Sequence, residues 1–286
     1  MRFGKCSLEH YCIHMLTQAE KAAAFEQLHK RAGTFIIPNP WDVGSAKVLE
    51  HLGFEALATS SAGYAFSIGT TDTNVGREGT MAHAGELAAA TDLPVSIDME
   101  HGFGDEPEFV AETIRLAAAT GAVGGSIEDS TKRKEDPIYE RALAVERIRA
   151  AAEVVRGLPF PFTLTARAEN YLVGRPDLKD TIERLQMYQE AGADVLYAPG
   201  LATRDDIAAV VSSLDRPVNI LMGMKGVQFT LAELSDMGVK RISVGAALAR
   251  CAYGNLLRAA REMREHGTFT FLDDESTPGS MSSILA

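Results

Sequence analysis

The chain has 286 residues, 46% of them hydrophobic, which is enough to build one large domain or two small ones. Its formal net charge of −11 argues against nucleic acid and acidic membrane surfaces as partners. No apolar run reaches the roughly 18 residues of a membrane-spanning helix. Three widely spaced cysteines form neither a disulfide framework nor a metal-binding motif, so we expect a cytoplasmic protein.

The N-terminal residues 1–14 lack the apolar core of a signal peptide, and we expect a disordered lead-in there. No linker or low-complexity segment divides the remainder. The sequence therefore predicts a single domain over residues 15–286 that ends in a helical appendage at 246–269.

Apolar and β-branched runs recur along the chain and predict eight strands. The runs cover residues 34–40, 56–61, 94–100, 124–129, 161–167, 195–200, 217–222 and 241–245. Amphipathic patterns predict helices between them, for example at 41–53, 107–122, 139–157 and 178–193. Several of these helices end at a glycine just before the next strand, where a C-cap is expected.

Eight strand–helix units in this length are what a (β/α)₈ barrel of the TIM type requires. A doubly wound open sheet is the main rival. That fold usually has fewer strands and a glycine-rich first βα turn, and "PNPWDVGS" is not such a turn. The sequence therefore favours an α/β protein with a barrel of parallel strands.

Polar residues collect where the predicted strands end, which is where barrel enzymes place their chemistry. These positions are Asn39 with Trp41 and Asp42, Ser60 and Ser61, Asp98 and Glu100, Glu128 and Asp129, Arg167 and Glu169, and Asn219. Asp72 lies in the loop after the second strand. We expect these side chains to surround one site.

The stretch "SIDMEHGFGD" (96–105) places two carboxylates, Asp98 and Glu100, on the same face of a strand. With Asp72 and Glu128 nearby, four like charges would repel each other unless a cation lay among them. An all-oxygen set without cysteine or histidine is typical of Mg²⁺ or Mn²⁺. Gly102 and Gly104 would let the backbone turn sharply beside the metal.

These motifs resemble the isocitrate lyase/phosphoenolpyruvate mutase superfamily. "SIDMEHGFGD" is similar to its D-x-[DE]-x-G-[FY]-G stretch, "SIEDS" to its fourth strand and "TARAEN" to its "ARTD" segment. The resemblance covers about residues 30–265 in the same order. It implies a barrel whose last helix is exchanged with a neighbour, in a homotetramer built from two such dimers.

The resemblance also implies the roles of the site residues. Asp98 would bind Mg²⁺ or Mn²⁺ directly, while Asp72, Glu100 and Glu128 would hold the water ligands of the metal. The catalytic residues would be Arg167, Glu128 and Asp72. The substrate, a small α-oxo or 2-hydroxy carboxylate, would contact Ser60, Ser61, Ala62, Arg167, Asn219 and Trp41. The shared chemistry passes through a pyruvate enolate, which the metal and Arg167 would stabilise.

The sequence departs from the family after the fourth strand. Isocitrate and methylisocitrate lyases carry a K-[KR]-C-G-H loop there, whereas this chain has "STKRKEDPIYE" without cysteine or histidine. Cleavage of isocitrate is therefore not expected, and the long loop of the phosphonate-cleaving members also has no clear match. Lys132, Arg133 and Lys134 in this loop are interpreted as a solvated charge run, with contact to a second anionic group as the alternative.

The sequence leaves several functions open. The first is a metal-dependent carbon–carbon lyase that decarboxylates oxaloacetate or cleaves a substituted malate, with Tyr64, His101 or Glu169 as a base. The second is a binding protein for α-oxo acids without turnover, and the third is P–C bond chemistry. Glycine-rich turns after strands seven and eight also allow a phosphate site. Arg167 has an alternative role as a structural ion pair with Glu128 or Glu169.

Overall fold

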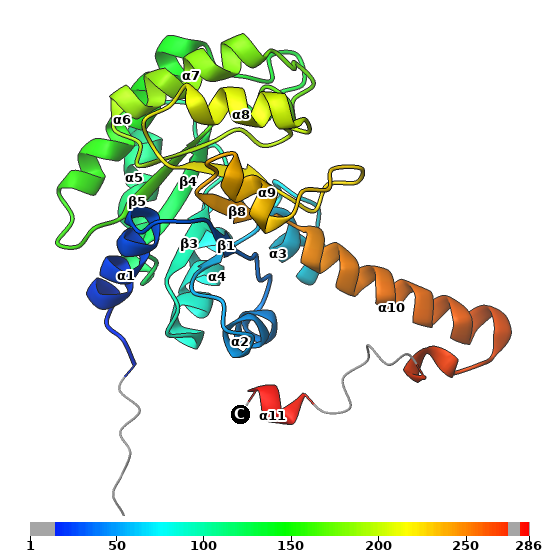
Figure 1. Ribbon diagram of the computed structural model, residues 1–286. Coiled ribbons are helices and arrows are strands. Elements are labelled where there is room, and N and C mark those ends of the chain that lie inside the picture. Colours follow the sequence, from blue (N-terminus) through cyan, green and yellow to red (C-terminus); the bar gives the residue numbers. More distant parts are fainter. Residues whose placement is uncertain (1–14, 274–280, 286) are drawn as a thin grey trace, which may run out of the picture.

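The computed structural model of the chain describes residues 15–273 and 281–285, so the predicted lead-in, residues 1–14, lies outside the described residues. Eight strands form one sheet, and every predicted strand contains an observed one (Figure 1). They are β1 (Phe35–Ile37), β2 (Leu57–Ala58), β3 (Val95–Asp98), β4 (Gly124–Glu128), β5 (Thr163–Arg167), β6 (Val195–Tyr197), β7 (Val218–Leu221) and β8 (Arg241–Ser243).

The strands pair in the order β1-β8-β7-β6-β5-β4-β3-β2, and every pair is parallel. The two end strands, β1 and β2, come together where the Ala58 N–H donates to the Pro38 carbonyl at 3.0 Å. The sheet is therefore a nearly closed barrel. The predicted (β/α)₈ class is confirmed, and the open-sheet alternative is wrong.

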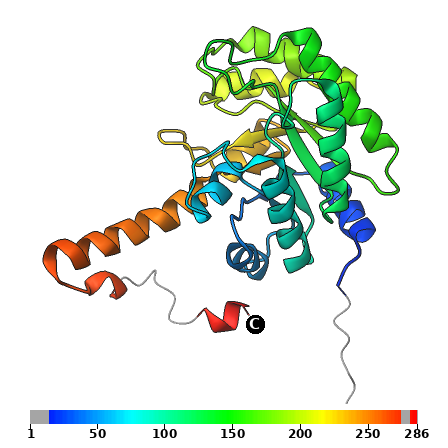
Figure 2. The ribbon, with the colours of Figure 1, turned by 180° about the vertical axis from the view of Figure 1, so that it is seen from behind.

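Helices surround the barrel in Figures 1 and 2. They are α1 (Gln18–Lys30), α2 (Val43–His51), α3 (Ser61–Ser67), α4 (Gly76–Ala90), α5 (Pro107–Ala119), α6 (Arg141–Arg156), α7 (Leu178–Ala191), α8 (Arg204–Ser212), α9 (Leu231–Asp236), α10 (Ala247–His266) and α11 (Ser282–Leu285), with a 3₁₀ turn at Thr270–Leu272. The α10 helix runs outward from the barrel, as both views show. None of the described helices is long and apolar enough to cross a membrane.

The α1 helix was not predicted from the sequence. It begins with a capping box in which Thr17 and Glu20 satisfy each other's backbone N–H groups. Phe25 of α1 is fully buried against Phe35 and Val123. Lys21 of α1 donates to the carbonyls of Ala88 and Thr91, just before β3, so the helix packs at the amino-terminal end of the barrel and extends the core there.

Side chains along each strand point alternately into the barrel and toward the helices, and this alternation determines which residues reach the site. In β3, Val95 and Ile97 are buried in the apolar layer beneath the helices, so Ser96 and Asp98 share the opposite, inner face. The same period of two in β5 turns Thr165 and Arg167 inward. The polar residues predicted at strand ends therefore reach the barrel interior, because each apolar neighbour faces the helices.

Candidate active site

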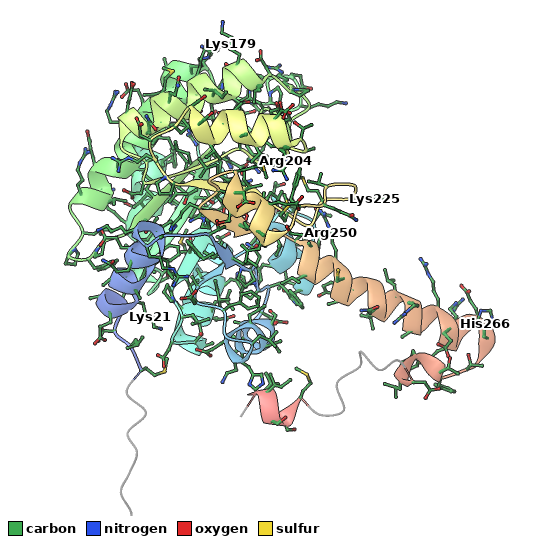
Figure 3. All side chains as sticks on the ribbon, in the orientation of Figure 1. Lys21, Lys179, Arg204, Lys225, Arg250 and His266 are labelled. Atoms are coloured by element: carbon green, nitrogen blue, oxygen red, sulfur yellow. The ribbon has the colours of Figure 1, made fainter. Side chains whose placement is uncertain are left out.

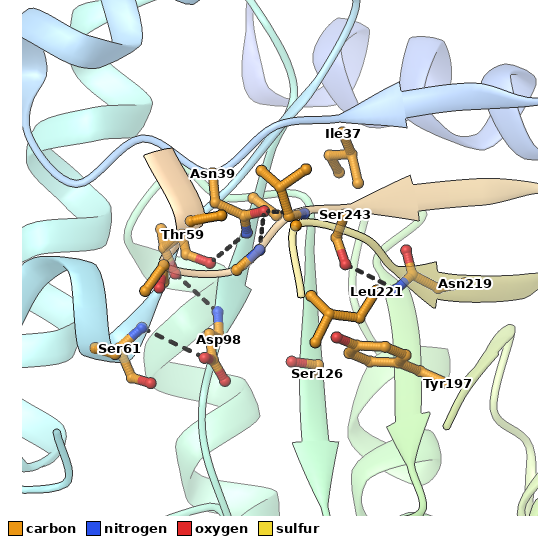
Figure 4. Close-up of a pocket in the computed structure, with 18 of the residues that line it drawn as sticks. Ile37, Asn39, Thr59, Ser61, Asp98, Ser126, Tyr197, Asn219, Leu221 and Ser243 are labelled. Carbon is orange, nitrogen blue, oxygen red and sulfur yellow. Dashed lines mark hydrogen bonds between the residues drawn. The ribbon is translucent and has the colours of Figure 1, made fainter. Parts of the chain in front are cut away.

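A cavity of about 270 Å³ opens at the carboxyl ends of the strands (Figure 4). Its wall includes Asp98 and Arg167, the last residues of β3 and β5. Five of the six predicted substrate-binding residues line it: Ser60, Ser61, Ala62, Arg167 and Asn219. Trp41 is not among the lining residues and instead lies next to Gly63, so its contact with substrate stays a prediction.

Asp98 is held from several directions at once. Its Oδ2 accepts from the Ser61 N–H at 3.3 Å, and its Oδ1 accepts from the Glu100 N–H at 3.2 Å. Arg167 Nη1 donates to Oδ1 at 3.1 Å. Burial raises the pKa of Asp98, but Arg167 and Lys132 outweigh it and leave the pKa below its usual value. Asp98 is therefore a fixed, ionised carboxylate at the edge of the cavity.

Arg167 joins three carboxylates. Besides Asp98, its Nη2 lies 3.1 Å from Glu128 Oε2 and 2.7 Å from Glu169 Oε1. Burial lowers the pKa of Arg167, but Glu169, Glu128 and Asp98 outweigh it and raise that pKa well above the usual value. Both predicted roles are compatible with this geometry, because the guanidinium lines the cavity and is also the centre of an ion-pair network.

Glu100 and Glu128 lie behind Asp98, each with a side chain only 3% exposed. Burial and the charge of Asp98 raise the pKa of Glu100 to about 7. Asp72 is exposed on the loop between α3 and α4, yet its charge also contributes to this shift. The four predicted acids therefore interact electrostatically, with Asp98 nearest to the cavity.

Lys132 enters this acid cluster, which the sequence interpretation as a solvated charge run missed. Its Nζ lies 2.5 Å from Glu128 Oε1 and 3.7 Å from Glu100 Oε2, and its side chain is 28% exposed. Its backbone has a φ of 60°, in the left-handed region that lysine seldom adopts. Arg133 and the exposed Lys134 point elsewhere, and Arg133 pairs with Asp105 at 2.7 Å.

We expect Lys132→Met to destabilise the metal-free protein by about 1–3 kcal/mol, because two buried carboxylates lose their ammonium partner. The exposed neighbour provides a matched control, Lys134→Met, which should leave stability unchanged. Urea unfolding at pH 8, with and without Mn²⁺, measures both variants. Equal stability of the two variants without metal would show that Lys132 contributes nothing to the cluster.

The turn after β3 is shaped by glycine. Gly102 has a φ of 80°, and a Cβ there would lie 2.9 Å from Val110 Cγ2. A Cβ on Gly104 would lie 2.4 Å from Phe109 Cγ. Arg147, buried on α6, donates to the carbonyls of His101, Gly104 and Asp105. The turn therefore needs both glycines and is held in place by a buried arginine that no sequence motif indicated.

A second polar network surrounds Asp129, which follows the end of β4. Asp129 Oδ2 accepts from Tyr188 at 2.5 Å and from Arg184 at 3.2 Å. Its Oδ1 accepts from the Glu169 N–H at 2.8 Å, and Glu169 in turn pairs with Arg167. Asp129 therefore positions Glu169 and does not line the cavity. Arg184 and Tyr188 lie on α7, and the amphipathic pattern of that helix in the sequence did not indicate a role at the site.

The residues suggested as a base lie in different places. Glu169 contacts Arg167 and is buried, with its pKa raised by that burial. Tyr64 stacks on His83 with ring centroids 3.8 Å apart and is not part of the cavity wall. The buried Nδ1 of His101 has no hydrogen-bond partner among the described residues, and burial lowers the pKa of this imidazole.

A hard divalent cation fits this set of donors. Within residues 15–273 and 281–285, no three acidic, histidine or cysteine side chains are arranged to ligate one ion together. Mg²⁺ typically keeps several waters and needs only one or two carboxylates. Asp98 at the cavity, with the acids Glu100 and Glu128 behind it, matches that requirement.

Comparisons with known proteins agree with this arrangement. The family model for phosphoenolpyruvate phosphomutase matches residues 25–264. The crystal structure of a candidate lyase/mutase from Burkholderia cenocepacia J2315 has 61% sequence identity and a TM-score of 0.89, covering 92% of this chain and 94% of that chain. A 2-methylisocitrate lyase from Halalkalibacterium halodurans is 27% identical over 261 residues, 88% of this chain and 85% of that protein.

An oxaloacetate decarboxylase from Bradyrhizobium sp. strain BTAi1 is also 27% identical, over 211 residues that cover 71% of this chain and 70% of that protein. The related proteins thus include enzymes named for carbon–carbon cleavage. With a match across most of the barrel, the chain belongs to the phosphoenolpyruvate mutase/isocitrate lyase superfamily.

Proposed function

We propose that the protein is a Mg²⁺- or Mn²⁺-dependent carbon–carbon lyase that acts on a small α-oxo or 2-hydroxy dicarboxylate, with decarboxylation of oxaloacetate as the preferred reaction. The observation that carries the proposal is the contact between Arg167 and Asp98 at the cavity wall, 3.1 Å apart. This pair places a fixed cation beside a fixed anion in a partly enclosed space. Such a site suits a reaction in which negative charge develops on an oxygen atom.

The residues of the chain have distinct roles in this proposal. Asp98 would hold the divalent ion, with Glu100, Glu128 and Asp72 holding its water shell. When bound, the ion would supply positive charge for the enolate oxygen that forms as a carbon–carbon bond breaks. Arg167 would stabilise the same charge, because its guanidinium is kept protonated by the three carboxylates around it.

Decarboxylation suits this chain better than isocitrate cleavage. The loop after β4 has no cysteine to serve as an acid or base, and release of CO₂ requires no strong base. Glu169 is the remaining buried carboxyl next to Arg167, with a raised pKa that would allow it to carry a proton near neutral pH. Cleavage of a substituted malate, which needs a base, would depend on this residue.

Two other functions remain as alternatives. The short loop after β4 motivates a binding protein for α-oxo acids without turnover, and the match to the phosphomutase family model motivates P–C chemistry. A coupled assay distinguishes all three. It follows pyruvate release from oxaloacetate, 2,3-dimethylmalate and phosphonopyruvate with Mg²⁺, and also formation of phosphoenolpyruvate from phosphonopyruvate, with the rate of the metal alone subtracted.

We expect enzyme-dependent pyruvate release from oxaloacetate. Conversion of phosphonopyruvate alone, to pyruvate or to phosphoenolpyruvate, would favour P–C chemistry. No conversion of any acid, together with metal-dependent oxalate binding measured by calorimetry, would favour the binding protein. The absence of both would contradict the proposed site.

We further propose that the protein assembles as a homotetramer through α10. Leu256 and Leu257 on this helix are 60% and 55% exposed, and Phe269 just beyond it is also exposed. Ala249 is the one buried residue among the described residues of α10. An apolar surface of this kind on an outward-running helix is typical of an interface between copies.

We expect the double variant Leu256→Glu/Leu257→Glu to shift the mass measured by light scattering from tetramer to smaller species. The control Arg261→Glu, on the same helix, changes charge without removing apolar surface. A wild-type protein that is monomeric at micromolar concentration would contradict the assembly proposal. A tetramer that survives the double leucine substitution would show that the assembly uses another surface.

A further inference from the structure

The inner layer of this barrel is unusual in its residue types. The layers inside (β/α)₈ barrels are mostly filled by bulky branched side chains. Here the inward positions below the acid cluster carry small polar residues instead, namely Ser96, Ser126, Thr165, Asn219 and Ser243. Ser96, Ser126, Asn219 and Ser243 line the cavity. The cavity therefore extends from the strand ends down into the barrel.

Arg241 lies at the deep end of this cavity. It is the first residue of β8, two positions before Ser243, and two residues of strand span roughly 7 Å. The Arg241 side chain is buried and still lines the cavity. The cavity is therefore elongated, with Asp98 and Arg167 at one end and Arg241 at the other.

The charge of Arg241 is not balanced by an acid. Its Nε donates to Asn219 at 2.8 Å, its Nη2 donates to Thr165 at 3.0 Å, and its Nη1 lies 3.4 Å from His29 Nε2. These partners are neutral, and no carboxylate of the described chain forms an ion pair with the guanidinium. An unpaired buried cation is costly, and an anionic ligand would remove that cost.

Further hydrogen-bonding groups line the same cavity as this arginine. Three neutral contacts leave two of the five guanidinium N–H donors for a ligand. The Ser96 and Ser126 hydroxyls line the cavity, and neither forms a hydrogen bond within the part of the chain that the structure describes. Figure 4 shows Ser126, Tyr197 and Asn219 around the same space.

We propose that Arg241, with Ser96 and Ser126, forms a deep subsite that binds the distal carboxylate of a dicarboxylic substrate. The inference rests on the proposed function, because the other end of the acid is taken to lie at Asp98 and Arg167. The subsite makes the protein selective for four- or five-carbon di-acids over mono-acids with the same α-oxo group. It binds this carboxylate inside the barrel, away from the exposed loops.

The cavity mouth offers a competing position for such a carboxylate. Arg250, in the first turns of α10, also lines the cavity, and Figure 3 shows it where α10 leaves the barrel. Arg250 is exposed, so an ion pair there would be weakened by solvent. The buried Arg241 is therefore the stronger recognition element, and the two arginines make a matched comparison.

The test compares two five-carbon ligands that differ at one end. Binding of 2-oxoglutarate and 2-oxovalerate to the full-length protein is measured by calorimetry with Mn²⁺, and oxalate serves as a probe of the metal end alone. We expect 2-oxoglutarate to bind at least about tenfold more tightly than 2-oxovalerate, since a hydrogen bond to a charged group has that effect. We expect Arg241→Met to reduce this ratio to about one and leave oxalate binding intact.

A second variant allows the subsite to be tested even if Arg241→Met does not fold. Ser126→Val fills the deep end with a residue that barrel interiors normally carry, and it keeps Arg241 in place. It should also lose the preference for 2-oxoglutarate while binding oxalate normally. Arg250→Met should retain the preference.

The subsite is wrong if the preference survives both Arg241→Met and Ser126→Val, or if it is lost in Arg250→Met. A wild-type protein that binds both five-carbon acids equally also excludes the subsite. Failure of the wild type to bind oxalate with Mn²⁺ would instead contradict the proposed function, so the two failures are distinguishable.

Discussion

Asp98→Ala is expected to abolish metal-dependent binding of oxalate while the barrel stays folded. Asp98 would be the direct metal ligand, so its loss should weaken Mn²⁺ binding by more than the roughly 10–100-fold that residues around a metal's ligands contribute. The fold should survive, because removing one of the like charges beside Glu100 and Glu128 relieves repulsion that raises the pKa of Glu100. Calorimetric titration with Mn²⁺ and thermal unfolding followed by circular dichroism measure the two effects.

The control for this prediction is Asp72→Asn. Asp72 is exposed and interacts with the cluster only at a distance, so its loss should fall within the range of about 10–100-fold. An Asp98→Ala protein that binds Mn²⁺ and oxalate as well as wild type would show that the metal assignment is wrong. A larger loss in Asp72→Asn than in Asp98→Ala would move the direct ligand to the loop after α3.

The barrel could be predicted because the patterns that indicate its strands and helices are local in the sequence and repeat along it. Apolar runs recur eight times with helices between them, several of these helices end at a glycine, and each predicted strand contains an observed one. The observed strands are shorter, with β2 reduced to Leu57–Ala58, the two residues that pair with β3. Asp98, Glu100, Glu128 and Arg167 could be found because parallel strands bring their carboxyl ends together.

Residues that act through tertiary contacts could not be found in the same way. Lys132 looked like one of three basic residues in a solvated loop, and only the left-handed backbone at this position turns its side chain into the acid cluster. Arg147 and Arg184 occupy ordinary helix positions, and their hydrogen bonds to Asp105 and Asp129 join residues 42 and 55 positions apart. Arg241 begins a strand, where sequence alone does not reveal that its counter-charge is missing.

Replacement of Arg167 separates catalysis from structure. Arg167→Ala should lower kcat by about 100–1000-fold, as expected for loss of a group that stabilises developing negative charge. It should also destabilise the protein by about 3–5 kcal/mol at pH 8, because the buried acids Glu128 and Glu169 lose their partner. Arg167→Lys should recover most of the stability but little of the turnover, since an ammonium cannot reproduce the fork of contacts to three carboxylates.

The stability loss in Arg167→Ala should depend on pH in a defined direction. Burial already raises the pKa of Glu169, and removing Arg167 takes away the charge that opposes this shift. Glu169 loses its proton near pH 8 in the wild type and at higher pH in the variant, so the penalty should grow as the pH rises through about 8. Urea unfolding of wild type, Arg167→Ala and Arg167→Lys at about pH 6.5 and about pH 9.5, on either side of the Glu169 pKa of about 8, gives the comparison. A penalty that is independent of pH, with turnover and stability lost in parallel in both variants, would mean that Arg167 is a structural ion pair and not a catalytic residue.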